Sequence, residues 1–397
     1  MFREFYINLY LLCFSFFFKI FSLFPQTQKI IFCVSFVENT HHIQQELKKQ
    51  SPNTPLVFIA FNNTSYDYFL NENNESNRVL LCSPKRIKFF LLSIFHLATA
   101  KIIVVDNYYG FLSVTNFKKN VKILQIWHAV GAIKKFGLED PSIFNRSKKA
   151  RERFKKVYNN FQYVIVGSDK MENIFQKAFK IHPSNFIHTG IPRTDLFFSR
   201  DTFLEIKKGL FERYPILRKK KVILYAPTFR NNNLNKFTLP FDLNLMSKKF
   251  KSEYVLILKL HPAISATGYS HNNSDDFILD LSKYPKINDL LFITDILITD
   301  YSSIPFEFSY FKKPMIFFPY DLKEYQQERG FWENYSTLVP GPIVQSTEEL
   351  IYFISKSDSS LREEENSLTF HLKWNKYSQG NSSKNVAVIL LDWLYAN

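Results

Sequence analysis

Short apolar runs rich in β-branched residues recur along the first half of the chain, and each is followed by a longer polar or helix-like segment. This alternation is typical of βα units, in which the strands lie side by side in a parallel sheet. We therefore predict a first α/β domain. Its expected strands lie at residues 30–36, 56–61, 102–106, 121–127 and 163–168.

The same pattern returns after a helix-like stretch at residues 201–213. A chain of 397 residues is long enough for two domains, each with its own core. We predict an N-terminal α/β domain over residues 25–198 and a C-terminal one over residues 199–397. The second domain's expected strands lie at 222–225, 254–260, 291–298 and 314–318, and a closing amphipathic helix lies at 385–395.

Residues 2–24 are mostly apolar and aromatic, with cations at the margins. The uncharged run from Phe5 to Phe18 is shorter than the roughly 20 residues that a spanning helix needs. No small-residue cleavage site follows it, which disfavours a secretory signal. We expect residues 1–24 to form an amphipathic helix in the membrane interface. The alternative is a greasy helix docked on its own protein.

The formal net charge is +15, which favours a polyanionic partner such as nucleic acid, anionic lipid or a phosphate-rich substrate. The stretch from Arg146 to Lys156 holds seven cations in eleven residues. It is either a solvated helix face or a contact for lipid headgroups. Cys13, Cys33 and Cys82 have no metal-ligand spacing, and their odd number fits a reducing cytosol.

The segment from Leu297 to Glu307 combines a strand end with a helix start. The apolar run stops at Thr299, the hydroxyls of Ser302 and Ser303 follow, and Pro305 then suits a first helical turn. Unpaired N–H groups and the helix dipole make such a corner an anion site, which we expect to hold a diphosphate. An ordinary capped helix explains the same residues.

Other predicted strands also end in polar or proline-marked turns. In open α/β sheets, ligands bind beyond the carboxyl ends of the strands, so we expect these turns to line one site. Cations for phosphate oxygens and a base for an attacking hydroxyl are what phosphate transfer needs. A strand-end histidine can equally be a structural residue. The residues are His128, Lys134, Arg193, Pro227, Thr228, Arg230, Lys259 and His261.

Familiar nucleotide-binding loops are absent from the sequence. It contains neither a Walker loop nor a G-x-G-x-x-G motif, which excludes P-loop NTPases and Rossmann dehydrogenases. No cluster of histidine, cysteine and carboxylate residues has metal-ligand spacing, so we expect no protein-bound metal.

Seven segments in a fixed order resemble the CDP-glycerol glycerophosphotransferase family, the teichoic-acid primases and polymerases of bacterial envelopes. Together they span roughly residues 120–340, more than half of the chain. LITDYSS and YAPTFR are the most specific of these motifs. The segments are QIWHAVGAIKKFG (125–137), HTGIPRTDLFF (188–198), VILYAPTFR (222–230), LILKLHP (256–262), DLLFITDILITDYSSIPFEF (289–308), KKPMIFFPYDLKEY (312–325) and RGFW (329–332).

This resemblance implies a GT-B-like fold, with two Rossmann-like domains facing across a cleft and a membrane-binding N-terminus. It implies transfer of a polyol phosphate, glycerol phosphate foremost, from a CDP-polyol to a hydroxyl of an acceptor, with release of CMP. The acceptor would be polyprenyl-diphosphate-linked or a polyol phosphate, and the product a teichoic-acid-like or capsular polymer. The enzyme would act as a peripheral protein on the cytoplasmic face of an anionic membrane. The resemblance specifies no cofactor and leaves dependence on a divalent metal open.

Residue by residue, the resemblance assigns His128 as the base and His261 as a second functional histidine. It places Arg193, Pro227, Thr228, Ser302 and Ser303 in contact with the donor, with the C-terminal domain as the CDP-polyol side.

Two departures from the family's pattern bear on specificity. The loop after His128 reads Ala-Val-Gly-Ala-Ile-Lys134, one residue longer than the family's usual His-Gly-Thr-Pro-Leu-Lys. Glu307 stands where the family usually has Asp. It could accept hydrogen bonds from ribose hydroxyls or merely favour the helix N-terminus.

Two rival functions remain open on sequence alone. One is a GT-B glycosyltransferase that uses a nucleotide sugar for an envelope polysaccharide. The other is a basic protein that binds nucleic acid or membrane without catalysis. The strand-end motifs favour the polyol-phosphate transferase, for which we expect no nucleic-acid partner.

Overall fold

The computed structural model describes residues 2–72, 78–228, 230, 238–260, 276–357 and 361–396. The chain forms two compact units. Unit 1 holds residues 1–129, 136–196 and 375–397, and unit 2 holds residues 130–135 and 197–374. The predicted boundary at 198/199 lies close to the crossing at Leu196 and Phe197. Two short segments depart from that single cut: residues 130–135 lie with unit 2, and residues 375–397 return to unit 1.

Unit 1 is built on a seven-stranded sheet in the order β3-β2-β1-β4-β5-β6-β7. Every strand pair in it is parallel. The buried strand residues are mostly Ile, Val, Leu and Phe, as a sheet covered on both faces requires. The strands are β1 (Thr27–Val34), β2 (Leu56–Ala60), β3 (Arg78–Leu81), β4 (Ala100–Val105), β5 (Lys122–Gln125), β6 (Tyr163–Ile165) and β7 (Phe186–Ile187).

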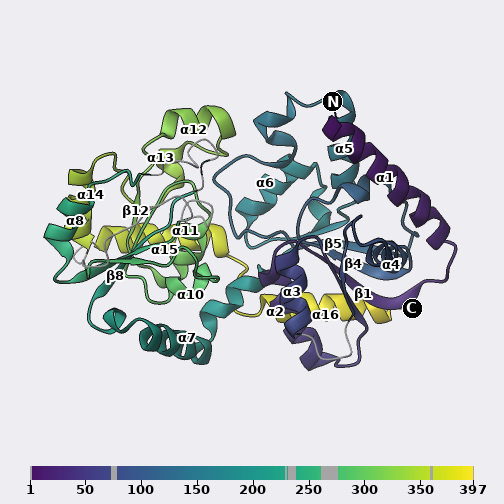
Figure 1. Ribbon diagram of the computed structural model, residues 1–397, viewed down its shortest axis with the longest axis horizontal. Coiled ribbons are helices and arrows are strands. Elements are labelled where there is room, and N and C mark those ends of the chain that lie inside the picture. The colour runs from purple at the N-terminus through teal and green to yellow at the C-terminus, as the bar shows by residue number, and fades with distance from the viewer. Residues whose placement is uncertain are drawn as a thin grey trace. The chain divides into compact units, whose positions relative to one another are not determined.

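Helices cover both faces of this sheet (Figure 1). The C-terminal helix α16 packs against α2 on one face, and α1 packs against α4 and the 3₁₀ helix η1 on the other. Both ends of the chain therefore belong to unit 1. Its α-helices are α1 (Phe2–Phe21), α2 (Val37–Gln50), α3 (Asn63–Glu72), α4 (Ile87–Ala98), α5 (Lys148–Tyr158), α6 (Asp169–Phe179) and α16 (Ser382–Tyr395). Its 3₁₀ helices are η1 (Gly110–Val114), η2 (Gly137–Glu139), η3 (Pro141–Ile143), η4 (Pro183–Asn185) and most of η5 (Pro192–Phe198).

Unit 2 has a five-stranded parallel sheet in the order β10-β9-β8-β11-β12. One face packs into an apolar core with α8 and α14. The strands are β8 (Lys221–Tyr225), β9 (Tyr254–Leu258), β10 (Ile278–Asp280), β11 (Ile296–Thr299) and β12 (Met315–Phe317). The helices are α7 (Arg200–Arg213), η6 (Pro215–Arg218), α8 (Leu243–Phe250), α10 (Ile287–Leu291), α11 (Ile304–Phe308), η8 (Ser309–Phe311), α12 (Leu322–Arg329), α13 (Tyr335–Leu338), α14 (Thr347–Lys356) and α15 (Leu361–Asn375).

The strand expected at residues 291–298 is wrong in its first half. Leu291 ends helix α10, a turn follows, and β11 begins only at Ile296. Asp295 interrupts the apolar run just before β11, and its carboxylate accepts a hydrogen bond from the backbone N–H of Val222. The other predicted runs each contain a strand, which confirms an α/β fold with two parallel sheets.

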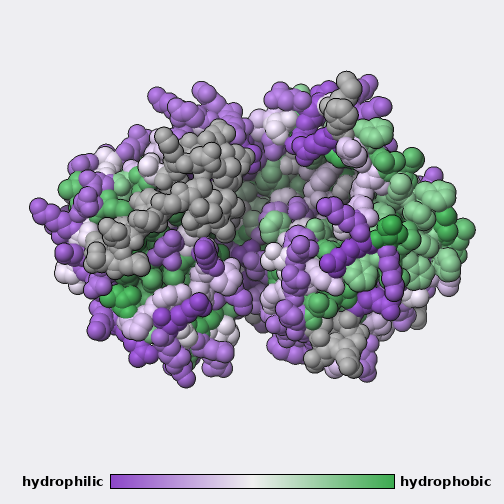
Figure 2. Space-filling model, in the orientation of Figure 1, coloured by the Kyte–Doolittle hydropathy of each residue, from purple (hydrophilic) through white to green (hydrophobic). Residues whose placement is uncertain are grey.

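Helix α1 combines a docked stripe with an exposed apolar face. Leu11, Phe14 and Phe18 are buried, and the Phe14 ring stacks on Phe111 with centroids 5.0 Å apart. The opposite side forms part of a hydrophobic surface on unit 1 (Figure 2). By length and composition α1 could also cross a membrane. The alternative of a docked helix therefore holds for one stripe of α1. The exposed side chains are Phe5, Tyr6, Leu9, Leu12, Phe16 and Ile20.

Candidate active site

Each sheet has a switch point, where the strand order reverses. In unit 1 it lies between β1 and β4, and in unit 2 between β8 and β11. Ligands of open α/β sheets bind outside the carboxyl ends of strands at such points. The predicted site residues that the structure describes divide between the two units, and each group is described within its own unit.

His128 lies just beyond β5, and its ring is fixed by a backbone carbonyl. Its Nδ1 is 3.0 Å from the carbonyl oxygen of Asp106, which follows β4. A carbonyl can only accept, so Nδ1 carries the hydrogen and the neutral ring has its lone pair on Nε2. His128 is therefore held in the tautomer that a general base needs.

Two aromatic rings stack on this imidazole. The Phe36 ring lies 4.1 Å away and 16° from parallel, and the Trp127 ring lies 4.4 Å away. The pKa of His128 is lowered to about 4, mainly by burial and also by the charge of Arg193, against the raising effects of the Asp106 carbonyl and Glu38. The imidazole is thus neutral at physiological pH. Trp127 has a φ of 49°, and such left-handed strain in a large side chain is often found at functional sites.

Arg193 joins His128 in unit 1. Its guanidinium donates to the carbonyl oxygen of His128 at 2.9 Å, and its backbone N–H donates to the side chain of Asn39 at 2.9 Å. Asn39 in turn donates to the carbonyl of Trp127 at 2.9 Å. A cation and the proposed base are therefore held beside each other by one network.

The turn before Arg193 is supported by the returning C-terminal segment. Gly190 has a φ of 80°, and a Cβ there would overlap atoms of Tyr377, Ser378 and Ser382. The carboxylate of Asp195 accepts the backbone N–H groups of Ser382 and Ser383 at 3.0 and 2.7 Å. The segment that closes the chain thus fixes the turn that carries Arg193.

In unit 2, Arg230 is bound by two carboxylates. Its Nε and one terminal nitrogen form a fork on Asp321 at 2.7 and 2.9 Å, and that nitrogen also donates to Asp300 at 2.8 Å. The guanidinium lies over the rings of Tyr301 and Tyr325, with centroids 5.0 and 4.8 Å away. Sequence predicts Arg230 as a substrate contact, yet much of its charge is matched inside the protein.

The turn with Pro227 and Thr228 follows β8, and both residues are half-buried. The backbone N–H of Thr228 donates to the Asp300 carboxylate at 2.7 Å, across the switch point. Asp300 also accepts the N–H of Tyr301 at 2.6 Å. One buried carboxylate therefore organises the ends of two neighbouring strands.

Lys134 belongs to the segment 130–135, which pairs with unit 2. It forms an antiparallel bridge with Phe331, and its ammonium lies 5.9 Å from the Tyr325 ring centroid. Burial lowers the pKa of Lys134 to about 8, helped by Arg329 and Arg230 and opposed by Asp300. Lys134 and Arg230 thus lie near the same ring, that of Tyr325.

Lys259 follows β9, and its ammonium donates to the carbonyl of Ser282 at 2.8 Å. Burial lowers the pKa of Lys259, and Asp280 opposes that shift. Because the ammonium has three N–H donors, one bond to a carbonyl leaves donor capacity for a ligand. Lys259 keeps a predicted substrate role.

The corner at Ser302 and Ser303 precedes α11, which is only five residues long. The Ser302 hydroxyl accepts the N–H of Ile304 at 3.3 Å, and the Ser303 side chain makes no capping bond. Glu307 lies on α11 and is buried. So short a helix adds a small dipole, so the predicted anion site depends on the hydroxyls and N–H groups. His261 lies outside the described residues.

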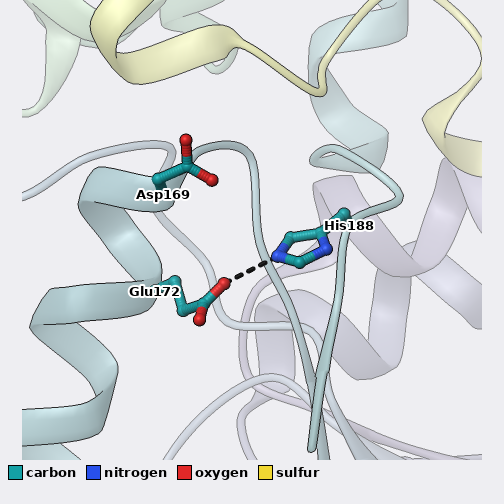
Figure 3. Close-up of side chains that lie close together, drawn as sticks. All are labelled: Asp169, Glu172 and His188. Carbon is teal, nitrogen blue, oxygen red and sulfur yellow. Dashed lines mark hydrogen bonds and ion pairs between the residues drawn. The ribbon is translucent and has the colours of Figure 1, made fainter. Parts of the chain in front are cut away.

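One group of side chains in the described residues has metal-ligand character, although the sequence showed no ligand spacing. Asp169 and Glu172 on α6 lie close to His188, with their ligand atoms within 4.8 Å of one another (Figure 3). His188 Nε2 contacts Glu172 at 2.6 Å. The ammonium of Lys376 contacts Asp169 at 2.7 Å, so a protein cation already supplies positive charge there.

Sequence reasoning missed the two buried aspartates, Asp106 and Asp300. Each directly follows a β-branched apolar strand, and that position next to a switch point was the available signal. Neither is a ligand-facing cation or hydroxyl, which are the groups that a phosphate-transfer hypothesis looks for.

Comparison with known proteins shows the family of this chain. The family model described as CDP-Glycerol:Poly(glycerophosphate) glycerophosphotransferase matches residues 15–392. A teichoic acid glycerol-phosphate primase of Bacillus subtilis (strain 168) is 38% identical over 378 residues, covering 94% of this chain and 95% of the relative. A teichoic acid ribitol-phosphate primase of Bacillus spizizenii (strain ATCC 23059 / NRRL B-14472 / W23) is 36% identical over 309 residues, covering 76% and 77%.

Solved structures show a shared fold. The wall teichoic acid polymerase TagF superposes with a TM-score of 0.80 at 22% identity, over 99% of this chain and 98% of that one. A UDP-GlcNAc 2-epimerase from Neisseria meningitidis superposes with a TM-score of 0.59 at 15% identity, over 92% and 100%. With the family model matched over nearly the whole chain, this protein belongs to the CDP-glycerol:poly(glycerophosphate) glycerophosphotransferase family and is a transferase of teichoic acid biosynthesis.

Proposed function

We propose that this chain transfers glycerol phosphate from CDP-glycerol to a hydroxyl of a polyprenyl-diphosphate-linked or polyol-phosphate acceptor, and releases CMP. The acceptor oxygen forms a new bond to the phosphorus that bears glycerol. The bond from that phosphorus to the bridging oxygen breaks, and CMP leaves with the electron pair. The acceptor's proton passes to His128 Nε2.

The observation that carries this proposal is the state of His128. Its Nδ1–H is bonded to the Asp106 carbonyl, which leaves Nε2 as a lone-pair acceptor. The imidazole is kept neutral by burial, and a bound diphosphate nearby would raise its pKa toward neutrality. Arg193 beside it supplies positive charge for the phosphate oxygens in the transition state of the transfer.

Unit 2 supplies groups suited to the CDP part. Lys134 and Lys259 bring cations, and Ser302 and Ser303 bring hydroxyls close to the end of β11. Glycerol is proposed as the polyol because the glycerol-phosphate primase of Bacillus subtilis matches 94% of this chain. A ribitol-phosphate primase matches 76%, so the donor panel must include CDP-ribitol.

The test is CMP release by the purified chain from CDP-glycerol, CDP-ribitol and a set of nucleotide sugars, with a lipid-linked acceptor present. CMP from CDP-glycerol that depends on the acceptor is expected. His128→Ala should lower the rate at least a hundredfold, as loss of a general base does. His182→Ala is the matched control, because His182 is a histidine on the surface of the same unit. Turnover of a nucleotide sugar instead would replace the proposal with the glycosyltransferase alternative.

We also propose that unit 1 binds the cytoplasmic face of an anionic membrane through α1 and α5. The exposed side of α1 is apolar, and α5 carries exposed cations from Lys148 to Lys156. The two helices are tied together, because Arg153 of α5 donates to both carboxylate oxygens of Glu4 in α1, at 3.1 and 3.2 Å. An apolar face beside a basic face is the pattern of an interfacial helix pair.

Co-sedimentation with vesicles tests this second proposal. Wild type should bind vesicles that contain anionic phospholipid, and bind more weakly as salt rises. Leu12→Glu should reduce binding strongly, because Leu12 is 68% exposed on α1. Leu245→Glu is the control, since Leu245 is 42% exposed on α8 in unit 2. Equal binding by both variants would show that α1 does not enter the interface.

A further inference from the structure

Asp106 stands at the switch point of unit 1 and is fully buried. Its carboxylate accepts the backbone N–H groups of Ser35 and Phe36 at 2.8 and 2.7 Å, and the hydroxyl of Tyr109 at 2.5 Å. Its backbone carbonyl accepts Nδ1–H of His128 at 3.0 Å. One residue therefore bonds both the turn after β1 and the proposed base after β5.

The carboxylate and the backbone carbonyl of Asp106 both act on the imidazole of His128. The carboxylate fixes the backbone of Phe36, and the Phe36 ring stacks on His128 with centroids 4.1 Å apart. The carbonyl fixes the edge of the same imidazole. Asp106 thus controls one face of the ring through Phe36 and its tautomer through Nδ1. The carboxylate points at main-chain donors and at Tyr109, so it has no direct part in binding a substrate.

The same relation recurs in unit 2. Asp300 directly follows β11, the strand across the switch point, and its carboxylate accepts the N–H of Thr228 in the turn after β8 at 2.7 Å. In each unit a buried aspartate after the strand across the switch point therefore holds the turn of its neighbour. The same arrangement on the second sheet indicates that this carboxylate positions the residues at the strand ends.

We propose that Asp106 is a positioning residue for the transfer reaction, which orients the imidazole of His128 so that Nε2 faces the acceptor hydroxyl. The inference rests on the proposed role of His128 as the base. Without the carboxylate, the turn at Ser35 and Phe36 loses its anchor, and Phe36 can leave the imidazole. A displacement of the base by about 1 Å can cost a hundredfold in rate.

Asparagine is the conservative replacement that this geometry allows. Its amide oxygen can accept both backbone N–H groups, and its amide nitrogen can donate to the Tyr109 oxygen. The Tyr109 hydroxyl can then donate to the Ser35 hydroxyl, which lies 2.9 Å away. Asp106→Asn should therefore keep kcat within a few-fold of wild type, whereas Asp106→Ala should lower kcat by about a hundredfold and leave KM for CDP-glycerol nearly unchanged.

A double-mutant cycle with the base separates positioning from plain structural support. If Asp106 acts through His128, Asp106→Ala should have no further effect on kcat once His128→Ala is present. Asp67→Ala, an exposed aspartate of the same unit, is the control and should behave as wild type. A further large loss in the double variant, or a wild-type kcat for Asp106→Ala, would overturn the inference.

Failure of the proposed function has a different signature. If His128→Ala alone turns over at the wild-type rate, the base assignment is wrong, and the positioning role is overturned with it. If His128→Ala is slow and Asp106→Ala is not, only the positioning role is wrong.

A second variant covers the case in which Asp106→Ala does not fold. Phe36→Leu leaves the carboxylate and its three donors in place and removes only the stacked ring. Without the stacked ring the imidazole can turn away from the Asp106 carbonyl, so we expect a lower kcat and, by nitrogen NMR of labelled histidine, a smaller share of the Nδ1–H tautomer at His128. Wild-type values for both measurements would refute the claim that Asp106 acts on the base through Phe36.

Discussion

Replacing Arg230 with methionine should unfold unit 2 at a much lower denaturant concentration. Methionine keeps much of the aliphatic length and removes the guanidinium. Asp300 then loses the guanidinium that faces it and keeps the backbone donors of Thr228 and Tyr301, in a site where its side chain is 2% exposed. Burial already raises the pKa of Asp300, and the charge of Arg230 is the main opposing effect.

The size of the expected loss in the free energy of unfolding follows from burial. Removing one partner of a buried ion pair costs about 3–5 kcal/mol, because the other charge stays buried and unpaired. Asp321 is 24% exposed and can be rehydrated, so we expect the lower end of this range, about 3 kcal/mol. Asp300→Asn in the Arg230→Met background should recover most of the loss, since no buried charge remains.

Hydrogen exchange under increasing urea measures this unit by unit. Global unfolding of a two-unit chain need not be two-state, so the free energy is read from amides of β8 and β11. Amides of β1 in unit 1 serve as the internal control. The same variants address the predicted donor contact: if Arg230 acts through Asp300, the double variant also recovers affinity for CDP-glycerol.

A loss below about 1 kcal/mol in β11 would refute this reasoning, because such a value is typical of a hydrated surface pair. An Arg230→Met/Asp300→Asn variant no more stable than Arg230→Met would do so as well. In that case the tyrosine rings around the guanidinium would carry the stability, and the charges would not.

Three further predictions concern other parts of the chain. Burial lowers the pKa of His128 to about 4, below its ordinary 6.5. We therefore expect kcat/KM to stay level as the pH falls through 6.5 and to decline only toward pH 4. A decline centred at pH 6.5 would contradict this. Gly131→Ala should destabilise unit 2 by about 1–3 kcal/mol in urea unfolding, because its Cβ would lie 2.5 Å from a ring of α11, whereas Gly209→Ala, with open space, should be neutral or stabilising. Phe14→Ala should lower the stability of unit 1 by about 3–5 kcal/mol, whereas Phe16→Ala, 59% exposed on the same helix, should change it by under about 0.5 kcal/mol.

Much of the sheet architecture could be predicted from the sequence, because long β-branched runs bury both faces of a strand. The strands that were missed, β3, β7 and β10, are only two to four residues long, and β3 and β10 each have a charged residue at one end. Such short runs look like loops until neighbouring strands pair with them. The error at Leu291 has a similar cause, since an apolar helix end and an apolar strand follow each other with one polar break.

The candidate site was predictable as a set of strand ends but not as a set of contacts. Arg230 bonds Asp300 and Asp321, which are 70 and 91 residues away in sequence, so nothing local shows that its charge is matched. Likewise, Gly190 reads as a turn glycine, and its φ of 80° fits that, but the close approach of the C-terminal segment adds a second requirement that the sequence does not show. Residue types at strand ends predict chemistry, whereas their partners depend on which strands become neighbours.

The two buried aspartates build the site without being the cations or hydroxyls that a phosphate-transfer hypothesis looks for. Asp300 has a cation beside it, but the side chain of Asp106 has only neutral donors, and burial raises its pKa to about 7 from an ordinary 3.8. A folded-state pKa that is raised in this way stabilises the fold below pH 4, and that stability is lost as the pH rises through 7. At neutral pH Asp106 therefore contributes less to stability than an uncharged isostere would. Its contacts, with the carbonyl on His128 and the carboxylate on the turn of Phe36, are therefore better explained by placing the base than by stabilising the sheet.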